Sequence, residues 1–171
     1  MSDIRVGIVM GSDSDWSTMK KAAKVCADFG VGCESRVLSA HRTPRETAEW
    51  AEGAAGRGIG VLIAGAGVAA ALPGVVAAAT TLPVVGVPVA SGPLNGVDAL
   101  LAIVQMPPGI PVATVGVNRA DNAGLLALQI LALGDPDLAA ALKDYRGRMG
   151  ERVAAADERV RQDAATLASG E

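Results

Sequence analysis

The stretch Arg5–Asp15, RVGIVMGSDSD, decides the fold that the sequence predicts. Its first half, Arg5–Met10, is a short apolar run, which is typical of a parallel strand buried on both faces. Its second half, Gly11–Asp15, is rich in the residue types that begin helices. From Trp16 to Phe29 apolar residues recur at helical spacing, and Gly30 is expected to end that helix. The chain therefore begins with a strand, a turn and a helix.

This strand–helix unit repeats along the chain. Further strands are expected at 33–38, 60–64, 83–89 and 111–117, and further helices at 44–55, 68–80, 97–105 and 123–133. Strict alternation predicts an α/β fold, a flavodoxin-like three-layer sandwich with a five-stranded parallel sheet in the order 2-1-3-4-5. The turns after the strands then meet at one edge of the sheet, where ligands bind in such folds. Those turns are residues 11–15, 39–44, 65–74, 90–96 and 118–122.

Composition narrows the class of protein. Half of the 171 residues are hydrophobic but only 2% are aromatic, which favours close packing of helices on a sheet. The net charge of −3 leaves no basic surplus for nucleic acid. A single histidine, His41, and two cysteines, Cys26 and Cys33, argue against a metal centre or a disulfide framework. Because the sequence shows neither a signal peptide nor a membrane-spanning run, we expect a cytoplasmic protein without nucleic-acid or membrane partners.

The C-terminal part, residues 135–171, differs from the α/β domain expected at residues 1–134. From Pro136 onward, apolar residues recur every three or four positions and charges fill the rest. This narrow stripe predicts one long helix. It is either an arm that packs on a neighbouring subunit or a helix that folds back on its own domain. We favour the arm, and we therefore expect a homo-oligomer.

Two loops at the predicted sheet edge carry the polar side chains of a candidate site. Gly11–Asp15 offers unpaired N–H groups and a helix dipole to an anion such as phosphate, although an ordinary helix cap fits the same residues. Ser39–Pro44 (SAHRTP) places the only imidazole beside a guanidinium. Arg42 is suited to a phosphate, and His41 to proton transfer near neutral pH. A lone histidine is more often structural, but no apolar run surrounds this one, which favours a functional role.

The glycine-rich segment Gly65–Ala70 (GAGVAA) imitates a dinucleotide-binding turn. A dinucleotide site needs a carboxylate at the end of the next strand, and Val87–Ser91 contains none. We interpret the glycines as letting the backbone approach a small flat ligand. The turn Ser91–Gly96 is either a rigid connection or a loop that closes over a ligand.

Five motifs form a combined pattern: GSDSDW at 11–16, SAHRTP at 39–44, AGAG at 64–67 with LPG at 72–74, GVPV at 86–89, and IVQMP at 103–107. The pattern resembles the class I N5-carboxyaminoimidazole ribonucleotide mutases of purine biosynthesis. The resemblance implies a ribonucleotide substrate whose carboxylate moves from the exocyclic nitrogen to C4 of the imidazole ring, no cofactor and no metal, and a homo-octamer. It also implies residue roles, with His41 as general acid and base. The residues implied in substrate binding are Gly11, Ser12, Asp15, Ser39, Ala40, Arg42, Gly65, Ala66 and Gly67.

The chain departs from this family at two positions. Ala71 stands where the family frequently has a histidine, and Val68 stands where a glycine is common. With one imidazole, His41 has to protonate the carbamate nitrogen and later accept the C4 proton. Arg42, where the related direct carboxylases have lysine, favours the mutase. Direct carboxylation of aminoimidazole ribonucleotide with free CO₂ and a non-catalytic nucleotide-binding module are the alternatives.

Overall fold

A five-stranded parallel sheet forms the centre of the first unit of the chain, which runs to Leu131. The computed structural model describes residues 4–169. The strand order β2-β1-β3-β4-β5 confirms the predicted topology. The strands are β1 (Ile4–Met10), β2 (Gly32–Val37), β3 (Val61–Gly67), β4 (Val84–Val89) and β5 (Ala113–Thr114).

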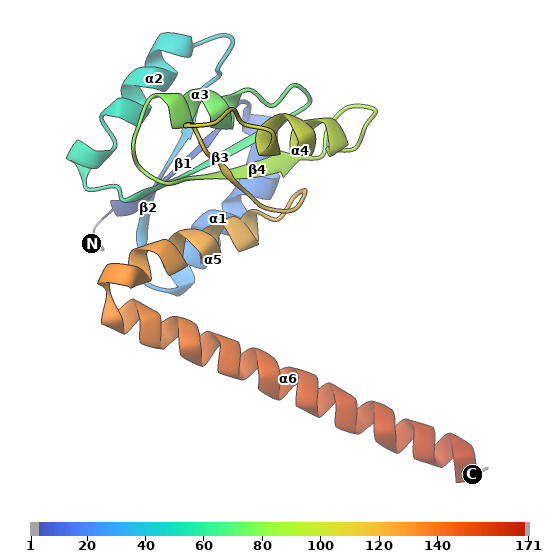
Figure 1. Cartoon of the computed structure of the whole chain (residues 1–171). Coiled ribbons are helices and arrows are strands. Elements are labelled where there is room, and N and C mark those ends of the chain that lie inside the picture. The colour runs from blue at the N-terminus through green and yellow to red at the C-terminus, as the bar shows by residue number, and fades with distance from the viewer. Residues whose placement is uncertain (1–3, 170–171) are drawn as a thin grey trace. The chain divides into compact units, whose positions relative to one another are not determined.

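Five helices cover the two faces of this sheet, as Figure 1 shows. Helices α1 and α5 pack on one face and on each other, and α2, α3 and α4 pack on the other face. The three layers are those of the predicted sandwich. The helices are α1 (Trp16–Asp28), α2 (Pro44–Glu52), α3 (Leu72–Ala78), α4 (Val97–Val104) and α5 (Ala120–Leu131), with short 3₁₀ turns η1 (Asp13–Asp15) and η2 (Ala55–Arg57).

The core consists of branched aliphatic side chains from the strands and small residues from the helices. Ile8 on β1 and Ile63 on β3 are fully buried, and every residue of β4 is buried. Between α1 and α5 the contact is made by small residues. A Cβ at Gly124 of α5 would lie 3.0 Å from the Val25 Cβ of α1. Small contact residues let the layers approach closely, which explains how a chain with so few aromatics fills its core.

Strand β3 is longer than predicted, and the helix after it is shorter. The sequence predicts a strand at 60–64, but β3 extends to Gly67 because its last residues pair with β4. Ladder hydrogen bonds outweigh the weak strand preference of glycine. Helix α3 begins at Leu72 rather than at residue 68 because Val68 and Ala70 have φ angles of 55° and 39°, which no α-helix accommodates.

Strand β5 covers only Ala113–Thr114, whereas the sequence predicts residues 111–117. The N–H of Asn118 donates to the Pro88 carbonyl at 2.8 Å. Pro88 has no N–H with which to continue the ladder on that side. The other predicted boundaries differ by a few residues. Helix α2 ends at Glu52, and α5 begins at Ala120.

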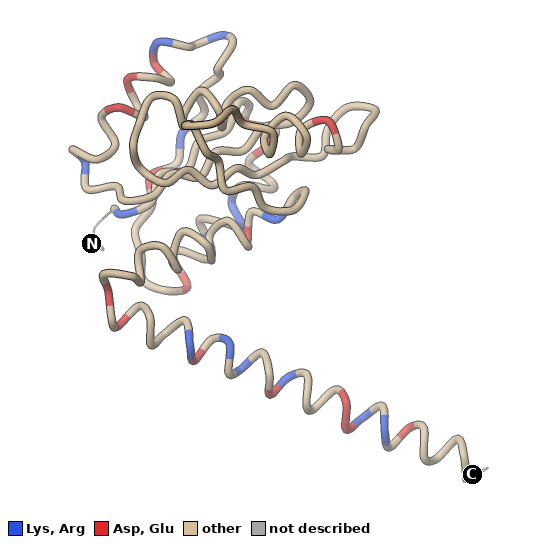
Figure 2. Tube along the Cα trace, viewed as in Figure 1, with Lys and Arg blue, Asp and Glu red and all other residues tan. Residues whose placement is uncertain are grey.

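The second unit begins at Ala132 and consists of a 3₁₀ turn, η3 (Ala132–Gly134), and the helix α6 (Pro136–Ser169). Its 34 residues confirm the long C-terminal helix. Asp135 begins the helix by accepting the Leu138 N–H at 3.0 Å. Acidic and basic residues are interspersed along α6 in Figure 2. None of the helices in residues 4–169 combines the length and the hydropathy that a membrane-spanning segment needs.

We expect Ile63→Ala to lower the free energy of unfolding by about 2–5 kcal/mol, because it leaves a cavity in the middle of the central strand. Ile4→Ala removes the same atoms from a side chain that is 44% exposed and is expected to change the free energy by less than about 1 kcal/mol. Urea titration measures both variants. Equal losses would contradict the assignment of β3 to the core.

Candidate functional site

A cavity of about 430 Å³ opens at the carboxyl edge of the sheet, where the turns after β1, β2, β3 and β4 meet. Its size falls within the range of about 300–1,000 Å³ that is usual for small-molecule sites. Nine of the ten predicted site residues line it: Gly11, Ser12, Asp15, Ser39, Ala40, His41, Arg42, Ala66 and Gly67. Segments far apart in the sequence therefore converge on one pocket.

The turn after β1 forms both a helix cap and a wall of the cavity. Ser12 is the N-cap residue of η1, and its Oγ accepts the Ser14 N–H at 3.3 Å and the Ser14 hydroxyl at 2.9 Å. The Ser12 hydroxyl itself donates to Asp13 Oδ1 at 3.2 Å. These contacts hold the turn in shape. The helix-cap interpretation is therefore correct for Ser12, and the same residue still faces the cavity.

Asp15 is the half-buried carboxylate of the cavity. Burial raises the pKa of this carboxyl above its ordinary value, and the neighbouring charge of Asp13 adds to the rise. Hydrogen bonds from the Ser12 backbone and the Ser14 side chain act in the opposite direction and favour the ionised form. The site thus holds a carboxylate in surroundings that disfavour its charge.

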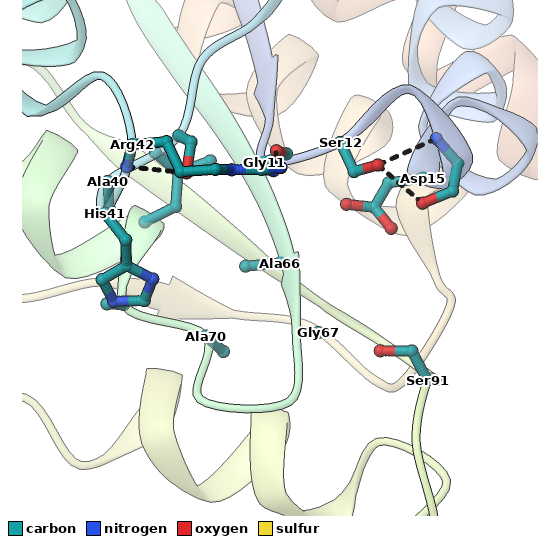
Figure 3. A pocket seen from close by; sticks show the side chains of 14 residues that line it. Gly11, Ser12, Asp15, Ala40, His41, Arg42, Ala66, Gly67, Ala70 and Ser91 are labelled. Carbon is teal, nitrogen blue, oxygen red and sulfur yellow. Dashed lines mark hydrogen bonds between the residues drawn. The ribbon is translucent and has the colours of Figure 1, made fainter.

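Arg42 joins the turn after β2 to the turn after β1. Its Nη2 donates to the Gly11 carbonyl at 2.9 Å, and its Nε donates to Ser39 Oγ at 3.3 Å (Figure 3). The Ser39 N–H in turn donates to Thr43 Oγ1 at 2.9 Å, which closes the loop. A guanidinium has five N–H donors, so donors remain for an anionic ligand. Arg42 therefore fixes the relative position of two loops while its charge lies at the cavity.

His41 is exposed to solvent at the cavity wall. In Figure 3 its ring lies across the opening from Ser12 and Asp15, and Ala66 and Gly67 of β3 lie between them. The ring is not turned into the hydrophobic core. An accessible imidazole that faces a pocket can exchange protons both with a bound ligand and with water.

The floor of the cavity is the end of β3, where side chains are absent or small. A Cβ at Gly67 would collide with the Ser91 Oγ and lie 3.0 Å from the Val89 carbonyl. Gly65 is the one predicted residue that does not line the cavity. It lies in the strand beneath the Met19 side chain of α1, which a Cβ would strike. A Cβ at either position would force the neighbouring side chain to move.

Five lining residues are outside the predicted set: Ser14, Ala70, Ala71, Leu72 and Ser91. The position of Ser91, directly after a strand that ends at the same edge, is a signal that could have identified it. Ala70 carries no such signal, because its place in the wall depends on a positive φ angle.

The polar side chains around the cavity are hydroxyls, one carboxylate, one guanidinium and one imidazole. Within residues 4–169, no group of three or more His, Cys, Asp and Glu side chains is placed to hold a metal ion. Hydroxyls and a guanidinium suit a phosphorylated ligand, a carboxylate suits sugar hydroxyls, and the imidazole adds proton transfer. Fold and site together define an α/β protein with a pocket whose side chains suit a small phosphorylated molecule.

The chain belongs to the family whose model is described as AIR carboxylase, which matches residues 5–152. An N5-carboxyaminoimidazole ribonucleotide mutase from Mycobacterium tuberculosis is 54% identical over 163 residues, which cover 95% of this chain and 94% of that protein. A mutase of the same name from Pyrococcus abyssi is 61% identical over 145 residues, covering 85% and 83%. A crystal structure of Treponema denticola PurE matches with a TM-score of 0.83 at 30% identity, over 90% of this chain and 96% of that one. The family expected from the motifs is confirmed.

We expect Asp15→Asn to raise the free energy of unfolding at pH 7. The folded state holds the Asp15 proton more tightly than the unfolded chain does, so ionisation at neutral pH destabilises the fold. The advantage of the variant should shrink as the pH falls toward 3.8, the ordinary value, and disappear below it, because the wild-type carboxyl is then protonated in both states. Urea titrations between pH 4 and pH 7 measure the difference. A difference that does not change with pH would contradict a raised pKa.

Proposed function

We propose that this protein is a mutase of purine biosynthesis that converts N5-carboxyaminoimidazole ribonucleotide to 4-carboxy-5-aminoimidazole ribonucleotide. The convergence of His41 with Ser12, Asp15 and Arg42 on one pocket carries the proposal. The names of its relatives from M. tuberculosis and P. abyssi support it. The reaction moves a carboxyl group within one substrate and therefore makes the protein an isomerase.

Different residues of the pocket wall bind different parts of the ribonucleotide. Arg42 and the hydroxyl of Ser12 bind the phosphorylated part through charge and hydrogen bonds. The Asp15 carboxylate accepts hydrogen bonds from hydroxyls of the ribose. Ala66 and Gly67 leave a flat space for the imidazole ring. Gly11, Ser39 and Ala40 complete the wall around the substrate.

His41 moves the proton in both halves of the reaction. As imidazolium it protonates the carbamate nitrogen. The bond between that nitrogen and the carboxyl carbon breaks, its electron pair stays on nitrogen, and CO₂ is released. C4 of aminoimidazole ribonucleotide then attacks the CO₂, and neutral His41 accepts the C4 proton. One imidazole that alternates between two protonation states balances the reaction without a cofactor.

The pocket contributes by holding CO₂ beside C4 until the new bond forms. Confinement beside C4 gives the gas an effective concentration that free solution lacks. Direct carboxylation of aminoimidazole ribonucleotide with free CO₂ is the second candidate, because the family description names that reaction. The two functions differ in whether bicarbonate or CO₂ has to be supplied from outside.

We expect the purified protein to turn over N5-carboxyaminoimidazole ribonucleotide in buffer depleted of bicarbonate. His41→Asn should lower kcat by about 10²–10⁴-fold, the usual contribution of a general acid and base, and leave the Kd of the product ribonucleotide within about threefold. Stopped assays measure turnover, and calorimetry measures binding. Full activity of His41→Asn would refute the mechanism, and turnover only with added bicarbonate would favour the direct carboxylase.

The proposal includes a homo-octamer in the cytoplasm, in which α6 packs on a neighbouring subunit. Met149, Val153, Val160 and Leu167 leave an apolar stripe exposed along α6, and such a stripe is normally covered. The helix is about 51 Å long at 1.5 Å per residue, longer than one small domain needs. The phosphorylated substrate supports a cytoplasmic location, because its charge prevents free passage through membranes.

We expect Val153→Asp combined with Val160→Asp to reduce the number of subunits, because two charges then enter the apolar stripe. Ala155→Asp combined with Gln162→Asp places the same charges about 180–200° around the helix and serves as the matched control. Light scattering coupled to gel filtration measures the subunit number. An unchanged number in the first pair would show that the stripe is not an interface.

A further inference from the structure

Ser91 brings a hydroxyl into the cavity from the turn after β4. In Figure 3 its side chain extends from the turn toward Gly67 and the interior of the pocket. Its Oγ lies so close to Gly67 that a Cβ there would collide with it. Among the residues that the structure describes, no hydrogen-bond partner of this hydroxyl is found. Ser91 thus presents a half-buried donor and acceptor to whatever fills the pocket.

The turn that carries Ser91 is attached to the rest of the sheet edge by Asn118. The Ala90 N–H donates to Asn118 Oδ1 at 2.9 Å, across 28 positions of sequence. The Asn118 N–H donates to the Pro88 carbonyl at 2.8 Å. Because Pro88 ends the regular ladder, the side chain of Asn118 replaces the main-chain acceptor that β5 would have offered to Ala90.

The conformation of Asn118 makes this contact specific. Its φ of 59° lies in the left-handed region, which asparagine tolerates better than most residues and glycine adopts freely. A backbone N–H can only donate, so the group that faces Ala90 has to be an acceptor. Asparagine meets both demands here, whereas glycine meets only the conformational one.

We propose that the Ser91 hydroxyl binds the ribonucleotide and that Asn118, through the Ala90 amide, is the positioning residue that holds Ser91 toward it. This inference rests on the proposed function. It adds a fourth strand end, that of β4, to a binding site otherwise built from the ends of β1, β2 and β3. Asn118 itself does not line the cavity and acts only through the turn that it holds.

The test compares variants that separate three effects: loss of the Ser91 hydroxyl, loss of the Asn118 acceptor and gain of backbone freedom. Ser91→Ala and Asn118→Gly are each expected to raise KM, and the Kd of 4-carboxy-5-aminoimidazole ribonucleotide, by about three- to tenfold, the usual effect of one lost hydrogen bond. The value of kcat should change by less than twofold in both. Asn118→Asp keeps an acceptor for Ala90 and should restore most of the affinity.

Asn95→Gly is the matched control. Asn95 also has a positive φ angle, 49°, and lies in the same turn as Ser91, but it does not line the cavity. The substitution adds the same backbone freedom to the turn without removing the Asn118 acceptor. It should leave KM within twofold of the wild type. A rise in KM equal to that of Asn118→Gly would mean that flexibility, not the hydrogen bond, is responsible, and would overturn the proposal.

The double variant Ser91→Ala with Asn118→Gly tests whether the two residues act as one unit. If Asn118 acts through Ser91, the Kd of the double variant for the ribonucleotide is no higher than the higher of the two single-variant Kd values. If the fold-increases in Kd of the two single variants multiply in the double variant, the positioning role of Asn118 is overturned. Unchanged affinity of Ser91→Ala would overturn the binding role of Ser91. Failure of the wild type to bind the ribonucleotide would instead refute the proposed function, so the two failures are distinguishable.

Discussion

The last residues of β3, Gly65–Gly67, determine how closely the surrounding elements approach the sheet. This segment pairs with β4, and the side chain of Met19 lies against Gly65 while the hydroxyl of Ser91 lies against Gly67. Larger side chains here would push α1 and the turn after β4 outward. The small end of the central strand therefore creates the floor of the cavity, and every other wall is positioned relative to it.

Polar contacts hold the walls of the cavity in position. These contacts use only some of the hydrogen-bonding groups of the side chains involved. Arg42 holds the turn after β1 through the Gly11 carbonyl and keeps further donors for a ligand. The carboxyl group of Asp15 lies where burial raises its pKa. Val68 has a positive φ angle, which is unfavourable for a β-branched residue. Groups held in unfavourable states cluster at binding sites, because the rest of the fold supplies the stability that they lack.

Local signals in the sequence were sufficient to predict the strand order, and together with the family resemblance they predicted most of the cavity. Alternating apolar runs and helical spacing identify the units, and Gly11–Asp15 and Ser39–Pro44 directly follow strands of a parallel sheet. The end of β3 could not be predicted, since ladder bonds to neighbouring strands override the weak strand preference of glycine. The role of Asn118 depends on Pro88, thirty positions away, and such pairing across the sheet leaves no pattern in one sequence.

A crystal structure with 4-carboxy-5-aminoimidazole ribonucleotide bound tests the account most directly. The account predicts the phosphorylated part beside Ser12 and Arg42, the imidazole ring over Ala66 and Gly67, and the His41 ring within hydrogen-bonding distance of the carboxylated end. A ligand bound elsewhere, or a His41 ring turned away from the carboxyl group, would contradict it.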